Sequence, residues 1–203
     1  MPPVSDSLLP FERALGPGEF VLYTGRLRSG KTLAAVRLAT LLAARLSCRL
    51  AANIPVTGGI LLHTLEDLLD LRDAVVVWDE IQASLDSREY ASQVSRLLTR
   101  ELILFGKRGI VLVGTTPAFA MVDTRLRRLT YHVHRTVRRL SWAGQTWATY
   151  DYYRHPAGDD VLRYVTSYAL CHSRWYGTYD TLYGRDAHHD LVLVSRAPAP
   201  PRR

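Results

Sequence analysis

The segment formed by residues 25–32, GRLRSGKT, constrains the fold of this chain more than any other feature of the sequence. It fits the pattern G-x-x-x-x-G-K-[ST] and lies between an apolar run, residues 19–24, and an Ala- and Leu-rich run, residues 33–46. The first run is typical of a buried strand, and the second of a helix. Glycines allow backbone N–H groups to point at phosphate oxygens, and a helix N-terminus favours an anion. The segment therefore predicts a phosphate-binding loop, rather than a glycine-rich turn that binds nothing.

The side chains of this loop predict the kind of ligand. Lys31 can reach the β- and γ-phosphates of a nucleoside triphosphate, and the Thr32 hydroxyl can bind Mg²⁺. We therefore expect ATP and Mg²⁺ as cofactors. The residues expected to contact the nucleotide are those of the whole motif: Gly25, Arg26, Leu27, Arg28, Ser29, Gly30, Lys31 and Thr32.

Two acidic residues follow a second buried run. Residues 74–78, AVVVW, are typical of a strand covered on both faces, and Asp79 and Glu80 come directly after it. Asp79 is placed to hold Mg²⁺, and Glu80 to activate a water molecule against the γ-phosphate. An acid that activates water favours ATP hydrolysis over a small nucleoside or nucleotide kinase, which usually has an Asp-Arg pair here. The Asn-Lys-x-Asp motif of GTPases is absent from the sequence.

The apolar run at residues 109–114 ends in Thr115 and Thr116. A polar side chain at this place can sense the γ-phosphate from the neighbouring strand, and we assign that catalytic role to Thr116. A plain Thr-Thr-Pro turn without a catalytic role is the alternative.

The chain is expected to form one α/β domain of the RecA-like (ASCE) P-loop type. Strand-like and helix-like runs alternate up to about residue 140, which predicts a mainly parallel central sheet flanked by helices. Alternating runs rich in Tyr, Trp and Thr predict antiparallel strands at 145–153 and 161–168. The other expected elements are strands at 49–56, 109–114 and 131–137, and helices at 65–71, 91–105 and 122–129. We expect a lead-in over residues 1–17, the domain over 18–195, and a flexible Pro- and Arg-rich tail over 196–203.

Charge and composition indicate the environment and the partner. The 203-residue chain carries 26 basic and 19 acidic residues, a net charge of +7, which favours an acidic partner such as nucleic acid. Ten basic residues lie between positions 96 and 139 against two acidic ones, a concentration that suits contacts with a DNA backbone. No apolar run approaches the ~20 residues that span a bilayer, and no signal peptide is recognised, so we expect a soluble intracellular protein. The two distant cysteines, Cys48 and Cys171, indicate neither a zinc site nor a disulfide.

The order of these motifs resembles that of the FtsK/HerA superfamily, and most closely that of the genome-packaging ATPases of tailless icosahedral viruses with an internal membrane. The resemblance covers roughly residues 18–182. Beyond the phosphate-binding loop, the segments that carry it are ANIP at 52–55, WDEI at 78–81, LDSR at 85–88, LILFGKRGI at 102–110, GTTP at 114–117, VDTRLR at 122–127 and YGTYDT at 176–181.

The resemblance implies a homo-oligomeric, hexameric ring that hydrolyses ATP to translocate double-stranded DNA into a preformed capsid. It further implies viral capsid-vertex or membrane proteins as partners, and a location in the host cytoplasm or at the packaging vertex of the virion. Lys31 and Glu80 would be catalytic, Thr32 and Asp79 would hold the metal, and an arginine from the next subunit would complete the site. The candidates for that arginine or for DNA contacts are Arg88, Arg108, Arg125, Arg127 and Arg128.

One position departs from the family pattern. The family usually closes the sensor strand with Gln, whereas this chain has Thr116 followed by Pro117. The related Zot-type filamentous-phage assembly ATPases share the same core but commonly carry a membrane segment. A Zot-like assembly or export ATPase is therefore the main alternative. A small nucleoside or nucleotide kinase and a non-catalytic structural P-loop module are weaker ones.

Overall fold

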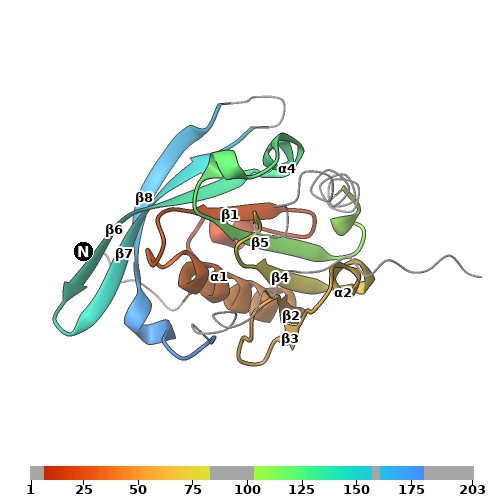
Figure 1. The fold of residues 1–203 in the computed structure, drawn as a ribbon, viewed down its shortest axis with the longest axis horizontal. Coiled ribbons are helices and arrows are strands. Elements are labelled where there is room, and N and C mark those ends of the chain that lie inside the picture. Colours follow the sequence, from red (N-terminus) through yellow and green to blue (C-terminus); the bar gives the residue numbers. More distant parts are fainter. Residues whose placement is uncertain (1–6, 83–102, 157–160, 181–203) are drawn as a thin grey trace, which may run out of the picture.

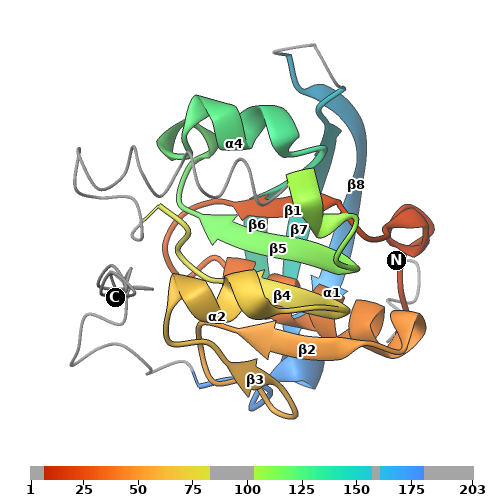
Figure 2. The same ribbon diagram turned by 90° about the vertical axis from the view of Figure 1, so that its right-hand side faces the viewer.

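A computed structural model describes residues 7–82, 103–156 and 161–180 of the chain (Figures 1 and 2). Within these residues eight strands form a single sheet in the order β3-β2-β4-β5-β1-β6-β7-β8. The strands are β1 (Phe20–Thr24), β2 (Arg49–Ala52), β3 (Ile60–Leu61), β4 (Ala74–Trp78), β5 (Ile110–Thr116), β6 (His132–Trp142), β7 (Gln145–Arg154) and β8 (Arg163–Cys171). The helices are η1 (Glu12–Ala14), α1 (Lys31–Leu46), α2 (Leu65–Asp70), η3 (Phe119–Met121), α4 (Thr124–Leu129) and η4 (His172–Trp175). In the part of the chain described, no helix has the length and apolar character needed to cross a membrane.

The strand order confirms the predicted fold class. The six strands from β3 to β6 run parallel, and β7 and β8 extend the sheet with antiparallel pairing. Strand β5 lies between β1, which leads into the phosphate-binding loop, and β4, which leads into Asp79. This insertion is the RecA-like arrangement, and it brings the carboxyl ends of β1, β4 and β5 to one edge of the sheet. Ligands of open parallel sheets bind at that edge.

Two apolar cores cover the two faces of the sheet. Side chains of β4 alternate between them, since Val75 and Val77 pack in the core around α1, whereas Val76 and Trp78 pack in the opposite core. Figure 2 shows α2 and α4 on the near face of the sheet and α1 behind it. Leu42 of α1 is fully buried, and removing such a side chain from water stabilises the fold by about 1.5–3 kcal/mol. The helix is therefore held by its apolar face.

The residues before β1 belong to the core. Leu8 and Leu15 are buried against α1, and Glu12 of η1 is completely buried. The Glu12 carboxylate pairs with the Arg37 guanidinium of α1 at 2.9 Å. Burial opposes the charge of Arg37, but the adjacent Glu12 carboxylate more than compensates and raises the pKa of Arg37. This buried pair fastens the N-terminal segment to α1.

Some element boundaries differ from those expected. Strand β2 ends at Ala52 rather than near residue 56, and the short strand β3, which was not predicted from the sequence, pairs with it in parallel. Strand β6 continues to Trp142, five residues beyond the expected end, and forms a long hairpin with β7. Of the helix expected at 91–105, residues 91–102 lie outside the described residues, and residues 103–105 are helical.

Candidate active site

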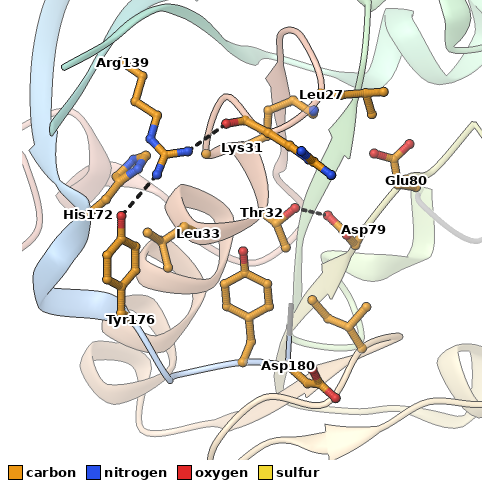
Figure 3. A pocket seen from close by; sticks show the side chains of 14 residues that line it. Leu27, Lys31, Thr32, Leu33, Asp79, Glu80, Arg139, His172, Tyr176 and Asp180 are labelled. Atoms are coloured by element: carbon orange, nitrogen blue, oxygen red, sulfur yellow. Dashed lines mark hydrogen bonds between the residues drawn. The ribbon is translucent and has the colours of Figure 1, made fainter. Parts of the chain in front are cut away.

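A cavity of about 320 Å³ opens beside the phosphate-binding loop (Figure 3). Its walls come from the loop, from the two acidic residues that follow β4, and from residues much later in the sequence. Those later residues are Arg139, His172, Tyr176, Tyr179 and Asp180. Figure 3 shows Asp79 and Glu80 on one side of Lys31 and Thr32, with Arg139, His172 and Tyr176 on the other. The cavity therefore has an acidic end and an aromatic, basic end.

The loop adopts the backbone that a phosphate-binding loop requires. Gly25 and Gly30 have φ values of 144° and 96°, a region that side chains disfavour. A side chain at Gly30 would also overlap the imidazole of His172. Lys31 is only 4% exposed, and its Nζ donates a 3.1 Å hydrogen bond to the Arg26 carbonyl. Burial lowers the pKa of Lys31, although the carboxylates of Glu80 and Asp79 oppose that shift.

The Asp79 carboxylate is bound by two hydroxyl groups. Thr32 Oγ1 and Thr115 Oγ1 each donate a 2.7 Å hydrogen bond to Asp79 Oδ1. Burial raises the pKa of Asp79, and the hydrogen bonds from Thr115 and Thr32 act against that shift. A hydroxyl and a carboxylate in contact provide the hard oxygen donors that Mg²⁺ prefers, so these residues fit a magnesium site.

Asn53 holds the backbone of Asp79. Its Nδ2 donates to the Asp79 carbonyl at 3.0 Å, and its Oδ1 accepts the Asp79 N–H at 2.7 Å. Asn53 follows β2, the neighbour of β4 in the sheet, so this two-point contact fixes the acidic residue against the adjacent strand. No role for Asn53 was predicted from the sequence, because the expected strand at 49–56 runs through it, whereas β2 ends one residue before it.

Glu80 has a strained backbone, with a φ of 52°. Its N–H donates to Thr115 Oγ1 at 2.9 Å, and its carboxylate accepts a hydrogen bond from the Gln82 amide. Non-glycine residues in the left-handed region cost about 1–3 kcal/mol, and they cluster at functional sites, where neighbouring contacts hold them. The contact with Thr115 is such a constraint, and it directs the chain after β4 across the end of β5.

Thr115, and not Thr116, presents its hydroxyl to the acidic residues. Successive side chains of a strand point to opposite faces, so only one of the two can do so. Thr116 Oγ1 donates instead to the Ala118 carbonyl at 3.3 Å. On this geometry Thr115 contacts the acidic residues, and the γ-phosphate sensor role assigned to Thr116 stays a prediction.

Four of the five arginines proposed for DNA contact or for a neighbouring subunit's site lie within the described residues, and none of these four lines the cavity. Arg88 lies outside the described residues. Arg108 precedes β5 at the opposite edge of the sheet, where its guanidinium donates to the Leu69 carbonyl at 2.9 Å. The remaining three lie on α4: Arg125 and Arg128 are exposed, and Arg127 donates to Thr124 Oγ1 and lies over the Phe119 ring. A role for any of them toward DNA or a neighbouring subunit stays a prediction.

A β-bulge brings a different arginine, Arg139, to the cavity. The β6–β7 register shifts between Thr136 and Arg138, so Thr136 lies opposite Tyr150 while Arg139 lies opposite Ala148. Directly opposed residues share a face of the sheet, so the bulge turns Arg139 to the face that carries Tyr150. Arg139 then donates to the Arg28 carbonyl at 3.2 Å and to the Tyr176 hydroxyl at 3.3 Å.

Tyr150 and His172 contact the phosphate-binding loop at Gly30. The Tyr150 hydroxyl donates to the Gly30 carbonyl at 3.0 Å and lies 2.7 Å from His172 Nε2. Since the hydroxyl has one proton, which goes to the carbonyl, His172 Nε2 must be the donor in the second bond. Burial, and then the charge of Arg139, lower the pKa of His172 to about 4. The imidazole is therefore neutral at physiological pH.

Comparisons with known proteins found similar solved structures, at low sequence identity. No protein-family model matches the chain, and no curated protein matches its sequence. Among solved structures, the N-terminal domain of zonular occludens toxin from Neisseria meningitidis is similar with a TM-score of 0.48 and 17% identity, over 80% of this chain and 98% of that one. The flagellar accessory protein FlaH from Methanocaldococcus jannaschii is similar with a TM-score of 0.44 and 12% identity, over 75% and 91%. By its own strand order and loop, the chain has the RecA-like P-loop NTPase fold, which generally binds a nucleotide with Mg²⁺.

Proposed function

We propose that this protein is a magnesium-dependent ATP hydrolase. The observation that carries the proposal is the 2.7 Å contact between Thr32 of the loop and Asp79 after β4, with Glu80 adjacent on the cavity wall. These are the two halves of a nucleotide-hydrolysing site, and they come from segments 47 residues apart. A P-loop that served only as a structural element would not need a second acidic residue at this edge.

Each residue has a separate task in the proposed reaction. The backbone N–H groups of the loop and the Lys31 ammonium bind the phosphates, and they stabilise charge that develops on them. Thr32 and Asp79 would hold Mg²⁺, which supplies further neutralisation of the β- and γ-phosphate charge when it is bound. Glu80 takes a proton from the attacking water, and Thr115 keeps the Glu80 backbone in place.

We further propose that hydrolysis drives movement of double-stranded DNA, in a homo-oligomer of the viral genome-packaging type. The support is the motif order and the positive charge of the chain. Three of the basic residues that carry this charge, Arg125 and Arg128 on α4 and Arg138 on β6, are exposed. The alternative is a Zot-like ATPase for filamentous-phage assembly or export, which would use the same site on a different substrate. A small kinase is the weaker candidate, because Glu80 is placed to activate water.

Phosphate release from ATP, measured on size-fractionated protein with and without double-stranded DNA, tests both levels of the proposal. Mg²⁺-dependent turnover that Lys31→Ala abolishes supports the hydrolase. Stimulation by DNA in the oligomeric fraction supports the packaging role. Turnover that neither DNA nor assembly affects would favour the assembly or export ATPase, and transfer of phosphate to a nucleoside acceptor would contradict both.

A further inference from the structure

The positions of the metal ligands fix the direction in which a nucleotide lies in the cavity. On the proposed function, the γ-phosphate lies at the end formed by Thr32, Asp79 and Glu80. The β- and α-phosphates follow along the loop and the start of α1, as the N–H groups there require. Figure 3 shows Arg139, His172 and Tyr176 on the far side of Lys31 from that end. The nucleoside must therefore leave the loop on the side of these three residues.

Tyr176 is the exposed aromatic group at that end. It is 54% exposed although it lines the cavity, and its hydroxyl accepts a hydrogen bond from Arg139 Nη2. Because Arg139 also donates to the Arg28 carbonyl, the tyrosine is tied to the phosphate-binding loop through one guanidinium. An aromatic ring anchored beside a cavity, with open surface left on it, has the features of a stacking platform.

Two other rings that line the cavity are less suited to that task. Tyr179 is partly buried, and its backbone forms a β-bridge with Val56. His172 is 3% exposed, and its imidazole is hydrogen-bonded to Tyr150 and packed against Gly30. Tyr176 is thus the ring that can accept a planar ligand without rearrangement of the fold.

We propose that Tyr176 binds the nucleobase of the nucleoside triphosphate by stacking, with Arg139 as the positioning residue that holds the ring against the loop. The inference rests on the proposed function, since the direction of the nucleotide is taken from the Asp79 end. Stacking on a single ring tolerates any base, so it contributes affinity for the nucleoside rather than a choice between adenine and guanine. The cavity volume, about 320 Å³, lies at the lower end of the range for small-molecule sites.

Binding of ATP and of inorganic tripolyphosphate, measured by calorimetry with Mg²⁺ on the full chain, tests this proposal. Tripolyphosphate contacts the loop but has no base. Tyr176→Leu should weaken ATP binding about tenfold, which is the range for loss of one base–aromatic stack, and should leave tripolyphosphate binding unchanged. Tyr176→Phe keeps the ring and should bind ATP within about threefold of the wild type.

Two controls separate the possible failures. Tyr164→Leu replaces another exposed tyrosine, on β8 and outside the cavity lining, and should bind both ligands like the wild type. Lys31→Ala should lose both ligands. If Lys31→Ala loses both while Tyr176→Leu binds ATP like the wild type, the stacking proposal is overturned and the hydrolase stands. If Tyr176→Leu weakens both ligands equally, Tyr176 supports the loop and the stacking proposal is also overturned. A wild-type protein that binds neither ligand overturns the proposed function as well.

Discussion

The Thr115 hydroxyl donates a 2.7 Å hydrogen bond to Oδ1 of Asp79, across the boundary between β5 and the end of β4. The Thr115 hydroxyl oxygen also accepts a hydrogen bond from the N–H of Glu80, at 2.9 Å. One side chain of β5 therefore holds both acidic residues of the candidate site.

Thr115→Val should lower the rate of ATP hydrolysis by about 10- to 100-fold, because it leaves the partly buried Glu80 N–H without its acceptor and removes a donor to Asp79. Steady-state phosphate release measures the effect. Thr116→Val is the matched control, since within the described residues the Thr116 hydroxyl donates to the Ala118 carbonyl and to neither acidic residue, and it should retain most activity. The reverse order of the two variants would favour the sensor role predicted for Thr116 from the sequence.

Asn53→Asp should impair hydrolysis more than Asn53→Ala. The aspartate cannot donate to the Asp79 carbonyl, and it places a second negative charge beside Asp79, which Asn53 now contacts through two hydrogen bonds. We expect the magnesium concentration for half-maximal turnover to change in both variants, which a metal titration at saturating ATP would measure. Equal and unchanged titrations would show that Asn53 does not position Asp79.

Glu12→Gln should lower the free energy of unfolding by about 3–5 kcal/mol, because it leaves the buried Arg37 charge without its partner. Urea denaturation followed by circular dichroism gives this value. The double variant Glu12→Gln/Arg37→Met removes both charges and should recover much of the loss. A loss below 1 kcal/mol in the single variant would indicate that the N-terminal segment is not fastened to α1 in solution.

Stability should fall as the pH is lowered from about 6.5 to about 4, in part because of His172. Its pKa is lower in the folded chain than in the unfolded chain, so in this window the unfolded chain binds a proton that the folded chain does not. The difference between 6.5 and about 4 corresponds to about 3 kcal/mol. Urea denaturation at pH 7 and pH 4.5 should show a smaller loss for His172→Gln, whose amide can still donate to Tyr150. Equal losses in the two proteins would contradict a buried neutral imidazole.

The parts of the site that were predictable from the sequence are local in the chain. The loop at 25–32 and the pair Asp79–Glu80 each depend on a strand and on the residues that directly follow it, so the apolar runs locate them. The strand order then brings the two segments together. The roles of Thr115 and Thr116 could not be told apart in this way. The sequence does not say which of the two adjacent side chains lies on the face of the sheet where it can reach the Asp79 carboxylate.

The aromatic and basic end of the cavity was not predictable from the sequence, because it depends on the register in which β6 pairs with β7. Without the bulge after Thr136, residues 136 and 139 would point to opposite faces, and Arg139 would lie away from the loop. Arg139 was therefore one of ten basic residues between positions 96 and 139, with nothing local to distinguish it. Tyr176 reaches the cavity only after β7 and β8 have returned the chain to the loop, and Arg139, which contacts Tyr176, bonds to Arg28 at a separation of 111 residues.

The most direct test of the central claim compares Glu80→Gln with the wild type in two measurements on the same preparation. The account predicts that Mg²⁺-ATP binds to both proteins with similar affinity, while phosphate release falls by about 10²- to 10⁴-fold in the variant, the usual contribution of a general base. Hydrolysis by Glu80→Gln at the wild-type rate would contradict the assignment of this cavity as the site of ATP hydrolysis.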